Sequence, residues 1–221
     1  MDSTLKQVFD RLFAAYGPRQ WWPADSPFEV LVGAMLVQNT SWQNVRKAID
    51  NLRRNDLLEP HALDAVPLEE LEELIRPAGY YRVKARRLRN LLDFLVERYD
   101  GSLESMFQTG LPELREELLR VSGVGPETAD SILLYAGGLL TFVVDAYTYR
   151  VMTRHGWICF DADYYQIQDH FQSGLPEDAA LFNEYHALLV EVGKRHCRKR
   201  PVCSGCPLAE LLPPGGPLEP D

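Results

Sequence analysis

The chain has 221 residues, a net charge of −9 and a hydrophobic fraction of 46%. This length and composition suit a globular protein with one large or two small domains, and they exclude a disordered or fibrous chain. No apolar run is long enough to cross a membrane, and the first residues lack the layout of a signal peptide, so we expect a cytoplasmic protein without a membrane partner.

The acidic charge counts against nucleic acid as a partner, because proteins that neutralise phosphates usually carry an excess of basic residues. The basic residues are nevertheless concentrated in two stretches, 82–89 and 194–200. Net charge therefore lowers the expectation of DNA binding without excluding it.

Apolar residues recur every three or four positions along most of the chain, which predicts an all-α fold. The predicted helices are Leu5–Ala15, Phe28–Leu36, Val45–Leu52, Leu68–Ile75, Lys84–Tyr99, Leu111–Val121, Glu127–Tyr135, Ala146–His155 and Phe182–Val192. The short β-like run Thr141–Val144 is predicted to be an extended lead into the next helix.

Both chain ends flank a long middle block, which indicates two helical lobes. Residues 25–130 would form a central lobe that includes a helical hairpin at about 118–136. Residues 1–24 and 137–212 would form the second lobe, with a cysteine-containing loop near its end. Residues 213–221 are rich in Pro and Gly and are predicted to be disordered.

The most informative segment is a turn between two predicted helices, made of Gly123, Val124 and Gly125 and followed by Pro126. Glycines let a backbone approach a phosphate closely, and the amides at a helix start favour an anion. Such a site uses backbone donors rather than lysines, which partly answers the objection from net charge. A plain helix–helix turn is the alternative.

Asp145 follows three apolar residues at an apparent helix start. An N-cap is the ordinary role of an aspartate at such a position. A cap explains the residue type, but it does not explain why a glycine hairpin precedes it at this spacing.

The hairpin pattern L-x-x-x-x-G-V-G-x-x-T-A followed by V-D resembles the endonuclease III superfamily of DNA glycosylases, over 28–206 of this chain. The resemblance implies two helical lobes with the active-site cleft between them. It also implies that Asp145 is the catalytic carboxylate and that hairpin residues, Thr128 among them, contact double-stranded DNA.

Bifunctional members of that superfamily carry a lysine two residues after the second hairpin glycine, where it forms a Schiff base with the sugar. Glu127 occupies that position here. A carboxylate cannot serve as this nucleophile, so we expect a monofunctional glycosylase that leaves an abasic site.

The motif Trp21-Trp22-Pro23, together with Trp42 after a Gln-Asn-Thr turn, is similar to the 3-methyladenine DNA glycosylase III subgroup. The resemblance implies that these residues line the pocket for the flipped base, with Lys194 near it. Indole rings attract a cationic alkylated purine by roughly 0.5–2 kcal/mol beyond burial. Packing in the core is the alternative for each tryptophan.

Three further residues are assigned by the same resemblance. Gln38 would fill the gap that the flipped base leaves in the duplex, and Tyr80 or Tyr81 would form a wedge that enters the stack. Each could instead be a simple packing or helix-end residue.

Cys197, Cys203 and Cys206 resemble the iron–sulfur loop of the superfamily, but the first gap is one residue short and Leu212 stands where the fourth cysteine belongs. A [4Fe-4S] cluster normally has four thiolate ligands. A structural cluster with an outside ligand, a zinc site that includes His196, and a loop without metal all stay open. Cys159, in an apolar context, is expected to be a buried free thiol.

These features predict a monofunctional DNA glycosylase of base excision repair that removes a flipped damaged base, such as 3-methyladenine. The expected partner is double-stranded DNA, and the expected state is a nucleoid-associated monomer. A glycosylase for a deaminated or mismatched base is one alternative. A non-catalytic damage sensor is another, although such a sensor would need neither Asp145 nor the tryptophans.

Overall fold

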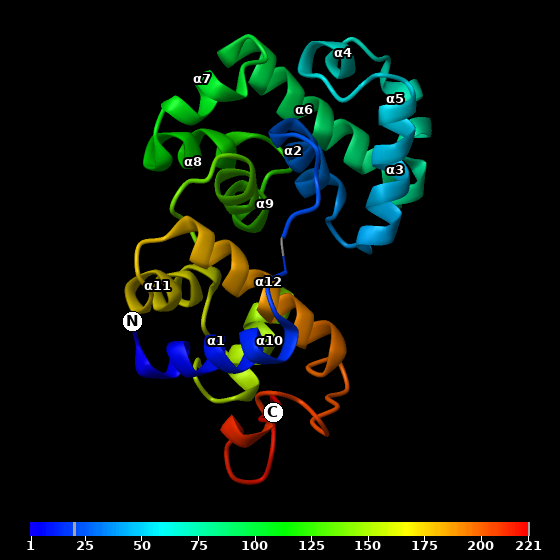
Figure 1. Ribbon diagram of the computed structural model, residues 1–221. Coiled ribbons are helices and arrows are strands. Elements are labelled where there is room, and N and C mark those ends of the chain that lie inside the picture. Colours follow the sequence, from blue (N-terminus) through cyan, green and yellow to red (C-terminus); the bar gives the residue numbers. More distant parts are fainter. Residues whose placement is uncertain (20, 221) are drawn as a thin grey trace. The chain divides into compact units, whose positions relative to one another are not determined.

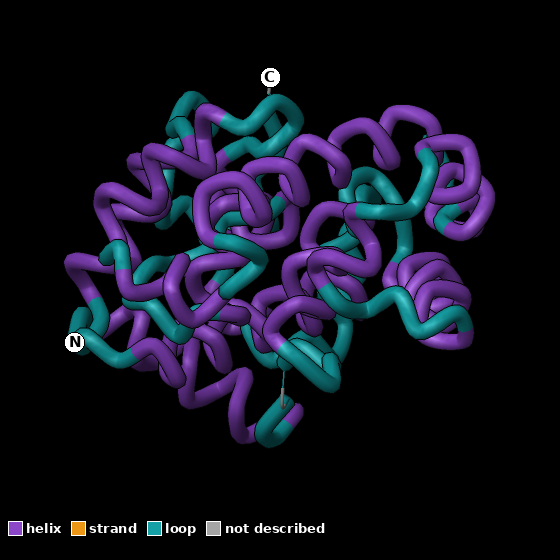
Figure 2. Tube along the Cα trace, turned by 90° about the horizontal axis from the view of Figure 1, so that it is seen from above, coloured by secondary structure: helices purple, strands orange, loops and turns teal. Residues whose placement is uncertain are grey.

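The computed structural model describes residues 1–19 and 21–220, and in this part of the chain it contains helices and loops but no strand (Figure 2). Gln20, next to the Trp-Trp-Pro motif, and Asp221, at the end of the predicted disordered tail, lie outside the described residues. The predicted all-α fold is confirmed. None of the described helices is both long and apolar enough to cross a membrane.

The chain divides into two compact units, which we call the terminal unit (Met1–Trp21 and Leu140–Asp221) and the central unit (Trp22–Leu139). The sequence places the boundaries near residues 24 and 130, whereas the observed division follows Trp21 and Leu139. The two adjacent tryptophans therefore belong to different units.

The helices of each unit are coloured along the chain in Figure 1. The central unit holds α2 (Pro27–Leu36), α3 (Trp42–Arg54), α4 (Pro60–Asp64), α5 (Leu68–Leu74), η1 (Arg76–Ala78), α6 (Tyr81–Tyr99), α7 (Leu103–Gln108), α8 (Leu111–Arg120), α9 (Pro126–Ser131) and η2 (Ile132–Ala136). The terminal unit holds α1 (Ser3–Tyr16), α10 (Ala146–Arg154), α11 (Tyr164–Gly174), α12 (Ala179–Arg195) and η3 (Ala209–Leu211).

Three helices, α4, α7 and α11, are absent from the sequence-based prediction. The first two span five and six residues, too short to show a helical period. For α11 a signal was present, because Asp163 and Gln166 form a capping box at its start. The predicted helix Glu127–Tyr135 also differs, since α9 ends at Ser131 and continues as a π-helical turn.

α2 is the centre of the central unit, and every residue from Phe28 to Leu36 is buried. It starts on a Ser26 cap with Pro27 in the first turn, and its apolar residues cover all sides, as expected of a helix surrounded by others. Its one charged residue, Glu29, is paired with Arg53 at 2.8 Å. This pairing offsets the cost of burying the carboxylate.

In the terminal unit, an extended segment leads into α10 through the core. Phe142 stacks on Phe171 with ring centroids 4.0 Å apart. The backbone amide of Phe142 donates to Gln172 Oε1 at 2.9 Å, and its carbonyl accepts from Gln168 Nε2 at 2.7 Å. Because these side chains satisfy buried backbone groups, the segment needs no sheet and delivers Asp145 to the start of α10.

The last residues of the chain contact the terminal unit. The amide of Leu218 donates to the Arg154 carbonyl at 2.9 Å, and Glu219 pairs with the Arg154 guanidinium at 2.8 Å. The structure therefore describes an ordered path for residues that the sequence analysis expects to be disordered.

An ion pair joins the two helices of the hairpin. Arg115 on α8 donates to both carboxylate oxygens of Asp130 on α9, at 2.8 and 2.9 Å. Asp130 is fully buried. Removing one partner of such a pair leaves an uncompensated charge inside the protein.

We predict that Arg115→Gln lowers the free energy of unfolding by about 3–5 kcal/mol, because it leaves Asp130 buried without its bidentate partner. Urea denaturation measures this change. Arg120→Gln on the same helix is the matched control, since its exposed pair with Glu116 is worth about 1 kcal/mol or less. Equal effects of the two substitutions would contradict the prediction.

Candidate active site

The two glycines of the hairpin turn in the central unit, Gly123 and Gly125, differ in conformation and in surroundings. Gly123 has φ +100°, and a Cβ on it would lie 2.3 Å from Arg87 Cγ. Both its conformation and the arginine stem therefore require glycine. Gly125 has φ −99°, and a Cβ there would meet no atom within 4 Å. Packing and conformation leave its identity unexplained, as expected of a glycine that keeps space open for a ligand.

The side chains of the hairpin are divided between the core and the surface. Val124 and Thr128 are buried, and Glu127 is exposed in the first turn of α9. The amides at this helix start receive no side-chain cap from Gly125.

Gln38, expected to enter the DNA stack, binds the hairpin in this structure. Its Nε2 donates to the carbonyl of Gly123 at 3.1 Å and to Thr128 Oγ1 at 3.0 Å. Its Oε1 accepts from Arg87 at 2.5 Å. Thr128 is thereby engaged inside the unit, and Gln38 fixes the hairpin to the end of α2.

Lys84 belongs to the basic stretch 82–89, but its side chain is buried. Its ammonium donates to the carbonyls of Leu36 and Ala78, at 2.8 and 2.7 Å. Burial lowers the pKa of Lys84 to about 8, with a smaller effect from the neighbouring Arg87. The residue ties the last turn of α2, just before Gln38, to the loop that carries Tyr80.

The structure distinguishes the two candidate wedge residues. Tyr80 is 74% exposed and has φ +48°, a left-handed conformation that is uncommon for an aromatic residue. Tyr81 is half-buried, with Arg76 4.8 Å and Arg82 5.6 Å from its ring centroid. Tyr80 is therefore the side chain that is available to a partner.

Trp22, which precedes α2, and Trp42, the first residue of α3, form an aromatic cluster beside Gly33 of α2. Their rings meet edge to face with centroids 5.0 Å apart, and Tyr135 lies 5.2 Å from Trp22. A Cβ on Gly33 would come within 3.3–3.4 Å of both indoles, so the glycine makes room for the cluster. Among the described residues, the buried Nε1 of Trp42 has no hydrogen-bond acceptor. Pro23, next to the cluster in sequence, is exposed.

In the terminal unit, Asp145 caps α10. Its Oδ1 accepts from the amide of Thr148 at 2.7 Å. Its Oδ2 lies 3.7 Å from His186 Nε2, and the carboxylate side chain is 13% exposed. The N-cap role and the proposed catalytic role are thus compatible, because the cap engages one oxygen and leaves the other directed elsewhere.

His186 lies beside this carboxylate, Trp21 lies beside His186, and Lys194 lies beside Trp21. The Lys194 ammonium lies 5.2 Å from the Trp21 ring centroid, and Trp21 meets His186 edge to face at 6.4 Å. Burial lowers the pKa of His186, which the charge of Asp145 partly opposes. Desolvation likewise lowers the pKa of Lys194, against the raising effects of Glu191 and Asp145.

A close helix contact positions these groups. A Cβ on Gly193 would lie 2.5 Å from the Tyr147 ring, so α12 can pack this closely against α10 only with glycine there. Lys194 directly follows this contact, and Tyr147 is two residues after Asp145. The sequence analysis did not identify His186 or Gly193. A single histidine on an otherwise apolar face of 182–192 was the available signal.

The C-terminal cysteines do not make a complete cluster site. Cys197 is buried, and Arg154 donates to its sulfur at 3.6 Å and to the Lys199 carbonyl at 3.0 Å. Among residues 1–19 and 21–220, no group of three or more His, Cys, Asp or Glu side chains is arranged to hold a metal ion. With three thiols and Leu212 at the fourth position, the chain supplies one thiolate fewer than a [4Fe-4S] cluster normally binds, so a cluster here would need an outside ligand. Cys159 is exposed, so its predicted burial is wrong.

The HhH-GPD superfamily model of base excision DNA repair proteins matches residues 32–177. The chain belongs to this superfamily. A Methanocaldococcus jannaschii protein provisionally named a DNA repair glycosylase is 50% identical over 209 residues, which cover 94% of each chain. Both findings confirm the expectation of a DNA repair glycosylase.

Two solved structures are similar over most of the chain. A non-covalent endonuclease III–DNA complex has a TM-score of 0.81 at 28% identity, covering 96% of this chain and 95% of the other. The H. pylori 3-methyladenine DNA glycosylase bound to 1,N6-ethenoadenine has a TM-score of 0.76 at 31% identity, covering 88% and 98%. These similarities confirm the predicted superfamily, and the second is consistent with the predicted subgroup.

We predict that Lys84 makes stability rise with pH. Its lowered pKa means that the unfolded chain holds this proton up to a higher pH than the native protein, so the free energy of unfolding increases between about pH 8 and 10.5. Compared with Lys84→Met, the wild-type protein should gain up to about 3 kcal/mol over that interval. Urea denaturation at several pH values measures the gain. Lys47→Met, which removes an exposed lysine of α3, is the control, and parallel pH curves for wild type and Lys84→Met would refute the prediction.

Proposed function

We propose that this protein is a monofunctional glycosylase that removes an alkylated purine, such as 3-methyladenine, from double-stranded DNA and acts as a monomer. The observation that carries the proposal is the environment of Asp145. Its carboxylate side chain is only 13% exposed, one oxygen accepts from the Thr148 amide, and the other lies 3.7 Å from His186 Nε2.

Asp145 would act on the sugar at C1′. As the C1′–N bond breaks, its electron pair leaves with the base and C1′ gains oxocarbenium character. A fixed carboxylate stabilises that positive charge more than the neutral ground state, which lowers the barrier. Water then adds to C1′ and loses its proton to Asp145 or to solvent, and an abasic site remains.

Two aromatic sites support a flat, cationic base. Trp22, Trp42 and Tyr135 form an aromatic cluster, and the Trp42 indole N–H has no acceptor among the residues that the structure describes. The Trp21 ring already has a cation near it, the Lys194 ammonium. The relative solved with 1,N6-ethenoadenine, a modified purine, favours the same substrate class for this chain. Attraction between a cation and an indole face is the physical basis of this preference.

The target base must leave the stack before it can react, and three elements of the central unit would assist. Tyr80 is exposed beside the start of α6, Gln38 follows α2, and the Gly123–Gly125 turn offers backbone amides. Tyr80 would enter the stack, Gln38 would fill the gap after leaving its hairpin contacts, and the amides would bind a phosphate.

We predict that Asp145→Asn slows single-turnover release of 3-methyladenine by about 100- to 1000-fold, the size expected when one electrostatic contact to the transition state is removed. Asparagine also caps helices, so the protein should keep its fold. Released base and alkali-sensitive abasic sites measure the rate on duplexes with one lesion each.

Asp163→Asn is the matched control, because it makes the same change at the cap of α11. Release by Asp145→Asn at the wild-type rate would refute the catalytic assignment. Release of uracil or of a mismatched thymine in preference to 3-methyladenine would refute the substrate class. Binding without release of any base would indicate a damage sensor.

We also predict that no covalent protein–DNA adduct forms when borohydride is added during turnover, because Glu127 stands where a Schiff-base lysine would be. Denaturing electrophoresis detects such an adduct, and a bifunctional endonuclease III provides the positive control. An adduct that disappears in Lys194→Gln would instead identify Lys194 as an amine nucleophile and overturn the monofunctional proposal.

A further inference from the structure

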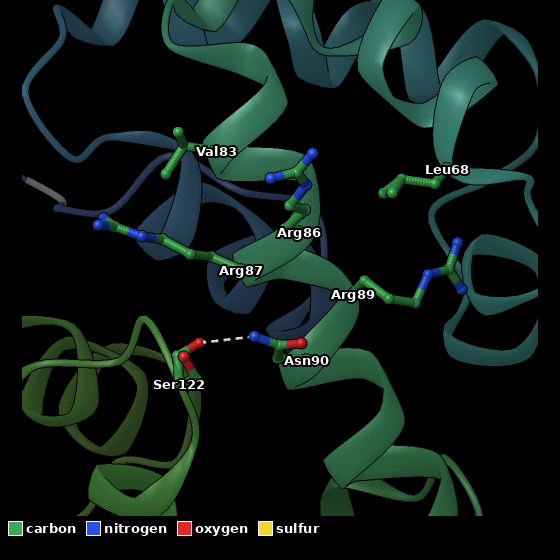
Figure 3. Close-up of a pocket in the computed structure, with 7 residues that line it drawn as sticks. All are labelled: Leu68, Val83, Arg86, Arg87, Arg89, Asn90 and Ser122. Atoms are coloured by element: carbon green, nitrogen blue, oxygen red, sulfur yellow. Dashed lines mark hydrogen bonds between the residues drawn. The ribbon is translucent and has the colours of Figure 1, made fainter.

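An open groove of about 530 Å³ lies beside the hairpin in the central unit (Figure 3). We call it the α6 groove. It is lined by Leu68, Val83, Arg86, Arg87, Arg89, Asn90 and Ser122. Three of these residues are arginines and none is acidic, in a protein whose net charge is −9. The groove therefore concentrates positive charge against the trend of the whole chain.

The three arginines differ in what they bind. Arg89 pairs with Asp64 at 2.9 Å and also donates to the Val66 carbonyl. Arg87 donates to Gln38 and packs its stem against Gly123. Arg86 is exposed, and within the described part of the chain it has no ion pair and no hydrogen bond. Figure 3 shows its guanidinium between those of the other two arginines in that view.

The groove is joined to the hairpin by direct contacts. Asn90 Nδ2 donates to the carbonyl of Ser122 at 3.0 Å, as drawn in Figure 3, and Ser122 directly precedes Gly123. Tyr80 and Val83, which are 74% and 48% exposed, precede Arg86 and Arg87 at helical spacing. The same surface thus runs from the exposed tyrosine through the free guanidinium to the glycine turn.

We propose that the α6 groove binds a backbone phosphate of the DNA duplex, with Arg86 as its main ligand. This inference rests on the proposed function only in naming DNA as the polyanion. A guanidinium donates two parallel hydrogen bonds to phosphate oxygens, and the Ser122 hydroxyl is a third donor within the same lining. Leu68 and Val83 offer apolar surface to the sugar. The site reads no base, so it contributes affinity and register rather than lesion specificity.

Continuity with the hairpin favours DNA over an acidic protein partner. An acidic peptide would need only the charge of the groove. A duplex would occupy the groove, the exposed Tyr80 and the glycine turn together, which accounts for all three features on one surface. The phosphate in the groove is distinct from the one at the hairpin amides, because it is held by side chains of α6.

The test is equilibrium binding of an undamaged duplex as a function of salt, measured by fluorescence anisotropy. Arg86→Gln should weaken binding about tenfold at moderate salt and should reduce the slope of log K against log salt by about one. Arg86→Lys should keep the slope and lose part of the affinity, since it keeps the charge without the bidentate geometry. Arg86 makes no ion pair or hydrogen bond with residues 1–19 or 21–220, so thermal unfolding of both variants should match wild type.

Arg120→Gln is the matched control, because it removes an exposed arginine two residues before Ser122 that is already paired with Glu116. A duplex series with one neutral methylphosphonate at each position then locates the contact. One substitution should weaken wild-type binding and leave Arg86→Gln unaffected, while substitutions at other phosphates affect both proteins alike.

Equal slopes for wild type and Arg86→Gln, or equal losses for Arg86→Gln and Arg120→Gln, would overturn the proposal. A methylphosphonate series with no position that depends on Arg86 would also overturn it and would direct the search to an acidic protein partner. Because the duplex carries no lesion, these outcomes are independent of base release. A protein that binds as predicted but excises nothing would refute the proposed function and leave the groove assignment intact.

Discussion

The arrangement of the central unit depends on hydrogen bonds that two long side chains, Lys84 and Gln38, donate to backbone carbonyls around the end of α2 and in the hairpin. The last carbonyls of a helix have no partner within it, and in a buried helix water cannot supply one. Lys84 satisfies the carbonyl of Leu36, and Gln38, two residues further on, reaches the carbonyl of Gly123. The hydrogen bonds of Lys84 and Gln38 thereby fix the hairpin, the Tyr80 loop and the start of α6 to one another.

This arrangement gives Gln38 two competing uses. In the structure its amide binds the hairpin and Arg87, and as a proposed gap-filling residue it would have to give up those bonds. The exchange replaces protein contacts with contacts to bases, so its cost is the difference between the two sets rather than the full strength of either. Arg87 would then lose its acceptor beside the α6 groove, where a phosphate could replace it.

The terminal unit holds the Asp145 carboxylate in a nearly buried position. The capping bond from Thr148 orients Asp145 at low cost, because the helix start needs an acceptor in any case. The close approach of α10 and α12 at Gly193 then places His186 3.7 Å from the same carboxylate and Lys194 within its electrostatic influence. Desolvation lowers the pKa of both neighbours, of which His186 is buried and Lys194 is exposed.

The sequence by itself determined the fold class, the superfamily and the candidate catalytic aspartate. Helical periodicity is a local property, and the hairpin with its following Val-Asp is contiguous, so neither needs contacts between distant residues to be recognised. The structure alone distinguished Tyr80 from Tyr81, showed that Lys84 is buried within its basic stretch and brought His186 to Asp145. It also left Arg86, alone of the three arginines that line the α6 groove, without an ion pair or hydrogen bond to the residues that the structure describes. Each of these outcomes depends on contacts between side chains that are far apart in the chain. Such burial and pairing arise only when the helices pack against one another.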